Sequence, residues 1–155
     1  MLLWIVRRHA LRNIANDGAL AARLAADRTL RRSVRRVELE SMTLSAQMEL
    51  FAASSALLAV HGQAMAWVMF LPTETRRTAA VEIFPAGLRN GIYQELSKSL
   101  GTRYEAIRAA AAPGCGGASG KTSDRLLCNV TVGVEKVASA ALRMVEWVGG
   151  GRWWG

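Results

Sequence analysis

The sequence predicts an all-α fold: a basic amphipathic N-terminal helix, one long apolar helix that spans a membrane, and C-terminal helices joined by a glycine-rich linker. Three observations support it. The apolar half of the composition is dominated by alanine, leucine and valine, whereas aromatic residues contribute only 6%. Alanine and leucine favour helices, and strand formers are sparse. An uncharged run crosses the middle of the chain, and apolar residues recur at helical spacing in its C-terminal half.

The first segment, residues 1–37, is predicted to be a presequence-like amphipathic helix. Its first 36 residues hold nine arginines and only two acids, Asp17 and Asp27. Arginine-rich, acid-poor starts are typical of mitochondrial presequences, and the alternative is a solvated basic helix on an ordinary protein. Arginine pairs well with phosphates and carboxylates. Four arginines are therefore candidate contacts for an acidic partner or for an anionic lipid such as cardiolipin: Arg31, Arg32, Arg35 and Arg36.

The second segment, residues 38–77, is predicted to be a long helix with a candidate transmembrane span over residues 50–72. No formal charge occurs in the 24 residues from Leu50 to Thr73. At about 1.5 Å per residue, a helix of this length matches the hydrocarbon thickness of a bilayer. Polar residues weaken the pattern, so a buried central helix of a soluble bundle is the alternative. In either case, the residues expected to lie in the membrane or to be buried are Leu50, Leu57, Leu58, Val60, His61, Trp67 and Phe70.

The C-terminal half is predicted to be helical on both sides of a linker. Short helices are expected within residues 78–112, where a capping box of Thr102 and Glu105 would begin one of them. The short apolar run of Val81, Ile83 and Phe84 could form a strand or a docking loop. Residues 113–122 form the glycine-rich linker, and residues 123–155 form an amphipathic helix with a tryptophan-containing tail. The residues expected to pack against a partner are Leu127, Val130, Val134, Val137, Trp153 and Trp154.

No pattern of residues predicts catalysis. The stretch from Gly114 to Thr122 resembles a phosphate-binding loop, but it has Cys115 where that loop requires glycine, and no strand is predicted before it. The only histidines are His9 and His61, neither near a predicted nucleophile. In a membrane helix His61 could ligate a haem or bond a quinone, but a histidine satisfied by a neighbouring helix is the favoured interpretation. We therefore expect no catalytic, cofactor-binding or metal-binding residues, no cofactor, and no enzyme.

The function expected from these features is architectural. The leading hypothesis is a non-catalytic accessory subunit of a mitochondrial inner-membrane complex, of the respiratory chain or ATP synthase, with other protein subunits and anionic lipid as partners. The alternative is a soluble helical protein of the mitochondrial matrix that binds rRNA in a mitochondrial ribosome or another ribonucleoprotein. The net charge of +8 fits either partner, because both are anionic.

Overall fold

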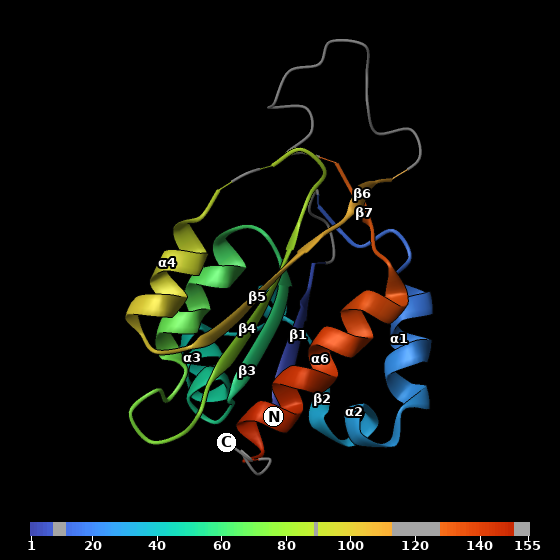
Figure 1. Cartoon of the computed structure of the whole chain (residues 1–155). Coiled ribbons are helices and arrows are strands. Elements are labelled where there is room, and N and C mark those ends of the chain that lie inside the picture. The colour runs from blue at the N-terminus through green and yellow to red at the C-terminus, as the bar shows by residue number, and fades with distance from the viewer. Residues whose placement is uncertain (8–11, 89, 113–127, 151–155) are drawn as a thin grey trace, which may run out of the picture.

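A five-stranded parallel β-sheet forms the centre of the molecule (Figure 1). The computed structural model describes residues 1–7, 12–88, 90–112 and 128–150. The strands lie in the order β2-β1-β3-β4-β5, and every neighbouring pair is parallel. They are β1 (Leu2–Val6), β2 (Val34–Glu38), β3 (Ala56–Val60), β4 (Ala79–Phe84) and β5 (Arg103–Arg108). The fold is therefore α/β, and the prediction of an all-α fold was wrong.

The central strands are apolar on both sides because helices cover both faces of the sheet. Every residue of β3 and β4 is buried, including one carboxylate, Glu82. Strands enclosed in this way read as continuous apolar runs without the alternation of a half-exposed strand. Hydrophobic periodicity does not distinguish short runs of this kind from a buried helix. The prediction therefore followed the alanine- and leucine-rich composition, which favours helices.

The uncharged run between Leu50 and Thr73 is three short elements rather than one long helix. It covers the end of α3 (Leu44–Ala52), all of β3, and the 3-10 helix η2 (Gln63–Phe70). The Ser54 hydroxyl donates to the carbonyl of Leu50 at 2.7 Å as the chain leaves α3. Within the described ranges, none of the helices combines the length and the apolar character that a membrane crossing requires. The predicted membrane span is therefore wrong.

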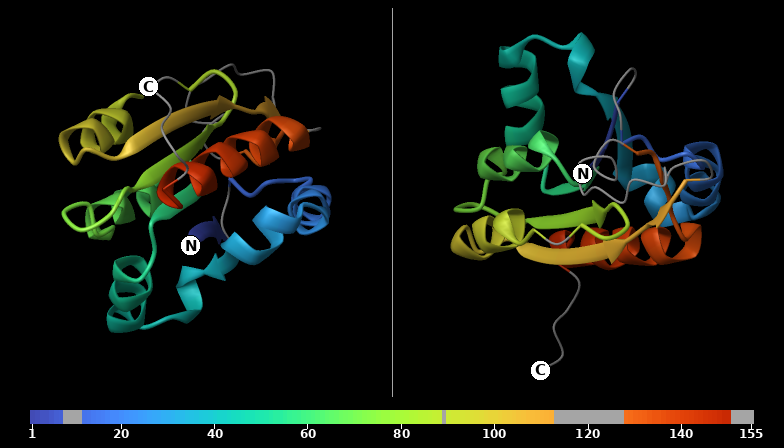
Figure 2. Two further views of the ribbon diagram at one scale, coloured as in Figure 1. Left: turned by 60° about the horizontal axis from the view of Figure 1, so that its bottom comes forward. Right: turned by 90° about the horizontal axis from the view of Figure 1, so that it is seen from above.

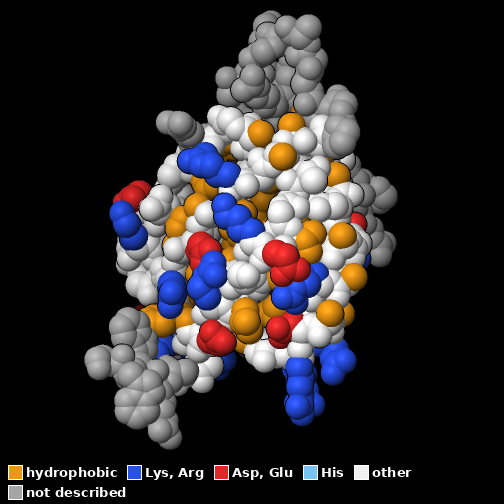
Figure 3. All heavy atoms as spheres, turned by 45° about the vertical axis from the view of Figure 1, so that its right-hand side comes forward, with side chains coloured by type: hydrophobic (Ala, Val, Ile, Leu, Met, Phe, Trp, Pro, Cys, Tyr) orange, Lys and Arg blue, Asp and Glu red, His pale blue; other side chains and the backbone are white. Residues whose placement is uncertain are grey.

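One face of the sheet carries three helices (Figures 1 and 2). They are α1 (Asp17–Ala26), α2 (Arg28–Ser33) and α6 (Val134–Val148). The Asp27 side chain caps α2 by accepting from the amides of Thr29 and Leu30, both at 2.9 Å. In place of one basic helix, residues 1–37 thus contain a buried strand, two short helices and most of an edge strand. On this side acidic and basic side chains are interspersed rather than gathered into one basic field (Figure 3).

The other face is covered by α3, η2 and α4 (Ile92–Ser99). The Phe51 ring stacks on Trp67 at 4.9 Å, and Trp67 contacts Phe70 at the same centroid distance. The short helix predicted to begin at the Thr102–Glu105 capping box is instead the edge strand β5. The Thr102 hydroxyl bonds that of Thr78 at 2.8 Å, and Glu105 pairs with Arg143. After β5 the chain forms the short strand β6 (Ala110–Ala111), which forms an antiparallel pair with β7 (Val130–Thr131).

The strand order creates a crevice at the carboxyl ends of the strands. The connection from β1 to β2 runs over one face through α1 and α2, whereas the connection from β2 to β3 runs over the other through α3. The chain therefore changes direction between the neighbouring strands β1 and β3. In doubly wound α/β sheets, ligands bind outside the carboxyl ends of the strands at such a switch point.

The buried strand β3 gives a direct test of this fold. Truncating Leu57→Ala removes a fully buried side chain and should lower the free energy of unfolding by about 2–5 kcal/mol. The matched change Leu44→Ala, in a side chain that is 65% exposed, should alter it by less than about 0.5 kcal/mol. Urea unfolding measures both variants. Equal losses from the two changes would contradict the fold.

Candidate functional site

The crevice between β1 and β3 holds a small hollow of about 50 Å³. Arg7 directly follows β1, and His61 and Gly62 directly follow β3. Arg7, Arg12 and Asp17 line the hollow. The Asp17 carboxylate is already bound by Arg36 at 2.6 Å. The two arginines therefore determine the charge of this hollow.

The guanidinium groups of Arg7 and Arg12 converge on Gly62. A Cβ atom built on Gly62 would lie 3.0 Å from Nη2 of Arg7 and 3.2 Å from Nη1 of Arg12. Gly62 also has a φ of +151° and a ψ of −172°, a conformation that is essentially restricted to glycine. The backbone conformation thus favours glycine here, and a side chain at this position would also make both guanidinium groups shift.

Hydrogen bonds to the small second sheet hold the chain that follows Arg12. The Val130 amide donates to the Asn13 carbonyl at 2.8 Å. The Asn16 side chain accepts from the Val132 amide at 3.0 Å and donates to its carbonyl at 2.9 Å. Arg12 itself has a φ of +74°, which is unusual for a residue with a side chain. Backbone in such a conformation often occurs at functional sites, where the surrounding bonds enforce it.

The two arginines leave positive charge unneutralised. Nη1 of Arg12 donates to the His61 carbonyl at 3.2 Å, while its Nε is buried and has no hydrogen-bond partner among the described residues. Burial and, next, the charge of Arg12 lower the pKa of Arg7, whereas Glu40 and Tyr93 raise it. Two guanidinium groups held together repel one another, and an anion between them would relieve that repulsion. The arrangement therefore suits the binding of an anion.

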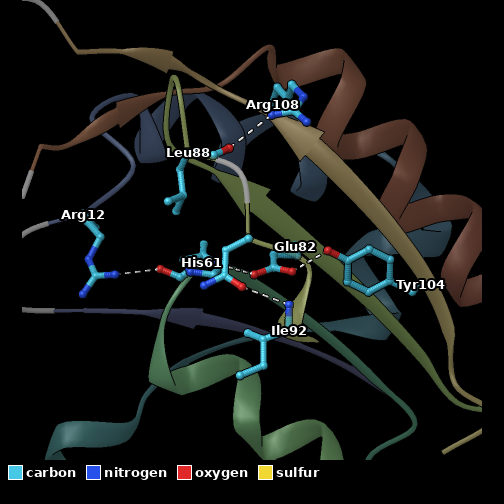
Figure 4. A network of polar contacts seen from close by, with 8 residues as sticks. Arg12, His61, Glu82, Leu88, Ile92, Tyr104 and Arg108 are labelled. Carbon is cyan, nitrogen blue, oxygen red and sulfur yellow. Dashed lines mark hydrogen bonds and ion pairs between the residues drawn. The ribbon is translucent and has the colours of Figure 1, made fainter. Parts of the chain in front are cut away.

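A buried polar cluster adjoins the site (Figure 4). The Glu82 carboxylate is fully buried in β4. One of its oxygens lies 2.5 Å from Nδ1 of His61, and the other accepts from the Tyr104 hydroxyl. A buried carboxylate without partners is very costly, so these bonds are required for the fold. Because His61 also bonds Arg12 through its carbonyl, Glu82 is linked to the arginine site.

The rings around His61 restrict its orientation. His61 is 7% exposed and stacks on Phe84 at 5.1 Å, while Tyr93 meets it edge-on at 5.4 Å. Burial and then the hydrogen bond to Glu82 raise the pKa of Tyr104, which keeps the hydroxyl protonated as a donor. Because Nδ1 of His61 contacts Glu82, Nε2 is the ring nitrogen left for other contacts.

The loop after β4 brings Tyr93 to this cluster. Nη1 of Arg108 donates to the Leu88 carbonyl at 3.2 Å, and the Asn90 side chain accepts from the Ile92 amide at 3.0 Å (Figure 4). These bonds fix the start of α4. Burial and the charge of Glu82 raise the pKa of Tyr93, against the opposite influence of the arginines. No group of three or more His, Cys, Asp or Glu side chains that could hold a metal ion occurs in the part of the chain that the structure describes.

The residues singled out from the sequence are dispersed, and two of them reach this site. Val60, at the end of β3, lines the hollow, and the carbonyl of His61 accepts from Arg12. Leu57 and Leu58 are buried in β3 and Leu50 in α3, while Trp67 and Phe70 lie in η2. Arg31 and Arg32 lie on α2, Arg35 and Arg36 on β2, and all four are exposed. Their contact with an anionic partner stays a prediction. Val130, Val134 and Val137 lie in β7 and α6, while Leu127, Trp153, Trp154 and the phosphate-loop-like stretch fall outside the described residues.

Sequence reasoning missed Arg7, Arg12, Gly62 and Glu82. Two signals in the sequence could have found Glu82 and Gly62. Glu82 is a single acid inside the apolar run AAVEIF, where a buried strand tolerates a charge only if partners bind it. His61 and Gly62 end another apolar run, as expected where a buried strand gives way to a tight turn.

Two comparisons with known proteins bear on this site. Residues 2–78, just under half of the chain, match the family model described as Glycosyltransferase 61. The matched range includes Arg7, Arg12, His61 and Gly62. This match contradicts the predictions that the chain is not an enzyme and that it is a non-catalytic subunit of a respiratory-chain or ATP-synthase complex. A sequence search of curated proteins returns no match.

The fold has a counterpart of known structure. A crystal structure of the flavodoxin-like domain of a Synechococcus sp. protein superposes with a TM-score of 0.52, covering 96% of this chain and 97% of that chain. The two sequences are 12% identical, so the likeness concerns the fold alone. The chain thus has a flavodoxin-like fold, and its N-terminal half is similar in sequence to the Glycosyltransferase 61 family.

Proposed function

We propose that the chain is a glycosyltransferase domain that binds the diphosphate of an activated sugar donor on Arg7 and Arg12. The observation that carries this proposal is the convergence of the two guanidinium groups on Gly62, at the switch point of the sheet. Phosphate oxygens suit the planar, charged donors of arginine. Many ligands carry phosphate groups. The similarity of residues 2–78 to the Glycosyltransferase 61 family favours a phosphate-activated sugar donor over the others.

The chemistry of sugar transfer explains why arginines would lie here. In the reaction the bond between the anomeric carbon and a phosphate oxygen breaks, and the diphosphate leaves with the bonding electrons. The oxygen of an acceptor hydroxyl bonds to the anomeric carbon, and its proton passes to the departing phosphate or to solvent. Negative charge grows on the leaving phosphate, and preorganised cations stabilise that charge most when water is largely excluded. Arg7 and Arg12, both partly buried, would serve this purpose.

His61 and Glu82 act in this proposal as positioning residues. The Glu82 carboxylate orients the His61 ring, and the His61 carbonyl accepts from Arg12. The same residue precedes Gly62, so the cluster fixes both the glycine and one of the arginines that contact it. The site would therefore be preorganised before the donor binds.

The first test of the proposal is anion binding. Inorganic pyrophosphate should bind the full chain, and Arg7→Ala or Arg12→Ala should weaken that binding about tenfold or more, because each change removes charge-assisted hydrogen bonds. The matched control Arg32→Ala changes an exposed arginine on α2 and should have little effect. Isothermal titration calorimetry at constant ionic strength measures all four proteins. The proposal fails if the control loses as much affinity as the site variants.

A second test uses Gly62. The change Gly62→Ala forces a side chain into a backbone conformation costing about 1–3 kcal/mol and displaces both guanidinium groups. It should lower both the free energy of unfolding and the affinity for pyrophosphate. The control Gly18→Ala, in α1, meets no atom within 4 Å and should leave both quantities near the wild-type values or slightly raise stability. Unchanged pyrophosphate affinity in Gly62→Ala would show that the anion binds elsewhere.

A further inference from the structure

A second and larger hollow adjoins the arginine pair. Its volume is about 330 Å³. It shares Ile5, Arg7 and Ala64 with the small hollow that holds the two arginines. The two hollows therefore meet at Arg7, and a ligand whose phosphates lie on the arginines could extend into the larger one.

The larger hollow is lined by a carboxylate, amides and an aromatic ring. Glu40 lies in η1 (Leu39–Ser41), which follows β2, while Gln63 and Trp67 lie in η2. Glu40 is exposed and forms no salt bridge with any residue of the described ranges. Its carboxylate can therefore accept hydrogen bonds from a ligand.

The walls of this hollow are held in place by the protein. The Gln47 side chain donates to the carbonyls of Leu39 and Met42, at 3.0 and 3.1 Å, and so fixes the segment that carries Glu40. On the other side, Trp67 stacks on Phe51 with an angle of 6° between the ring planes. Trp67 remains partly exposed toward the hollow. Both groups are thus preorganised for a ligand.

The position of Glu40 indicates which part of a donor would lie here. Arg7 and Arg12 would hold the diphosphate, so either the sugar or the nucleoside must extend toward β2. In doubly wound folds that bind dinucleotides, an acidic residue beyond the glycine-rich first turn hydrogen-bonds a ribose hydroxyl, and Glu40 is an acidic residue that follows β2 here. An aromatic ring beside an amide suits a planar base with polar edges, because bases stack on aromatic side chains and bond through their edges.

We propose that the larger hollow binds the nucleoside of the donor, with the ribose hydroxyls at Glu40 and the base near Gln63 and Trp67. This inference rests on the proposed function, because it takes the diphosphate to lie on Arg7 and Arg12. It makes the donor a nucleoside diphosphate sugar, with its sugar directed away from β2.

Glu40→Gln tests the ribose contact with little change in shape. The wild-type chain should bind ribonucleoside diphosphates at least about tenfold more tightly than inorganic pyrophosphate. Glu40→Gln should lose about tenfold of that affinity, because the hydroxyls lose a charged acceptor, while pyrophosphate affinity should not fall. The matched control Glu74→Gln changes an exposed glutamate outside both hollows and should bind both ligands as the wild type does.

A 2′-deoxynucleoside diphosphate sharpens the comparison. It should bind the wild-type chain more weakly than its ribose counterpart, and Glu40→Gln should shrink that difference. A sugar 1-phosphate should be insensitive to Glu40→Gln. The opposite pattern, with the sugar 1-phosphate weakened and the nucleoside diphosphates unaffected, would place the sugar in the larger hollow and overturn the inference.

The outcomes separate this inference from the proposed function. If pyrophosphate binds through Arg7 and Arg12 but nucleoside diphosphates bind no more tightly, the inference fails and the diphosphate site stands. If pyrophosphate fails to bind the wild-type chain at all, the proposed function itself fails. Thermal unfolding of each variant in the absence of ligand verifies that the chain is folded.

Discussion

The contact of two guanidinium groups with a residue that lacks a side chain is the constraint on which the site depends. Holding two guanidinium groups close together costs electrostatic free energy. Hydrogen bonds in the rest of the fold hold the two segments that carry them. Arg7 is placed by the end of β1, and Arg12 by a segment tied to Val130 and Val132. Gly62 provides the space between them. Bonding energy from the rest of the fold thus maintains an arrangement that a phosphate would stabilise.

The sheet makes this arrangement possible because its strand order brings the segments that follow β1 and β3 together at the carboxyl ends of the strands. The two arginines follow β1, the glycine follows β3, and Glu82 reaches the same region from β4. Glu82 is buried where only paired charges are tolerated, and its partners His61 and Tyr104 come from the segments on either side of β4. The cluster therefore joins the centre of the sheet to the arginine site. The cluster of Glu82, His61 and Tyr104 thus couples the stability of the core to the geometry of the arginine site.

The sequence predicted little of the fold and almost none of the site, for identifiable reasons. Strands enclosed on both faces resemble a buried helix or a membrane span when no alternation is present, and this explains the wrong predictions for β1 and β3. A helix does lie in the C-terminal segment, over Val134–Val148, where the amphipathic pattern is strong because only one side packs on the sheet. Arg7 and Arg12 were read as part of a presequence because they lie among other arginines. Only the strand order shows that they meet Gly62, which is about 50 residues away in the chain.

The central claim, that the arginine pair over Gly62 is a phosphate site, is tested most directly by nuclear magnetic resonance. Titrating the labelled chain with inorganic pyrophosphate should shift the backbone amides of Gly62 and Gln63 and the Nε–H resonances of Arg7 and Arg12 before any others. A phosphate between the guanidinium groups would alter all four environments at once. Shifts that begin instead at the exposed arginines of α2 and β2, with Gly62 unchanged, would contradict the account.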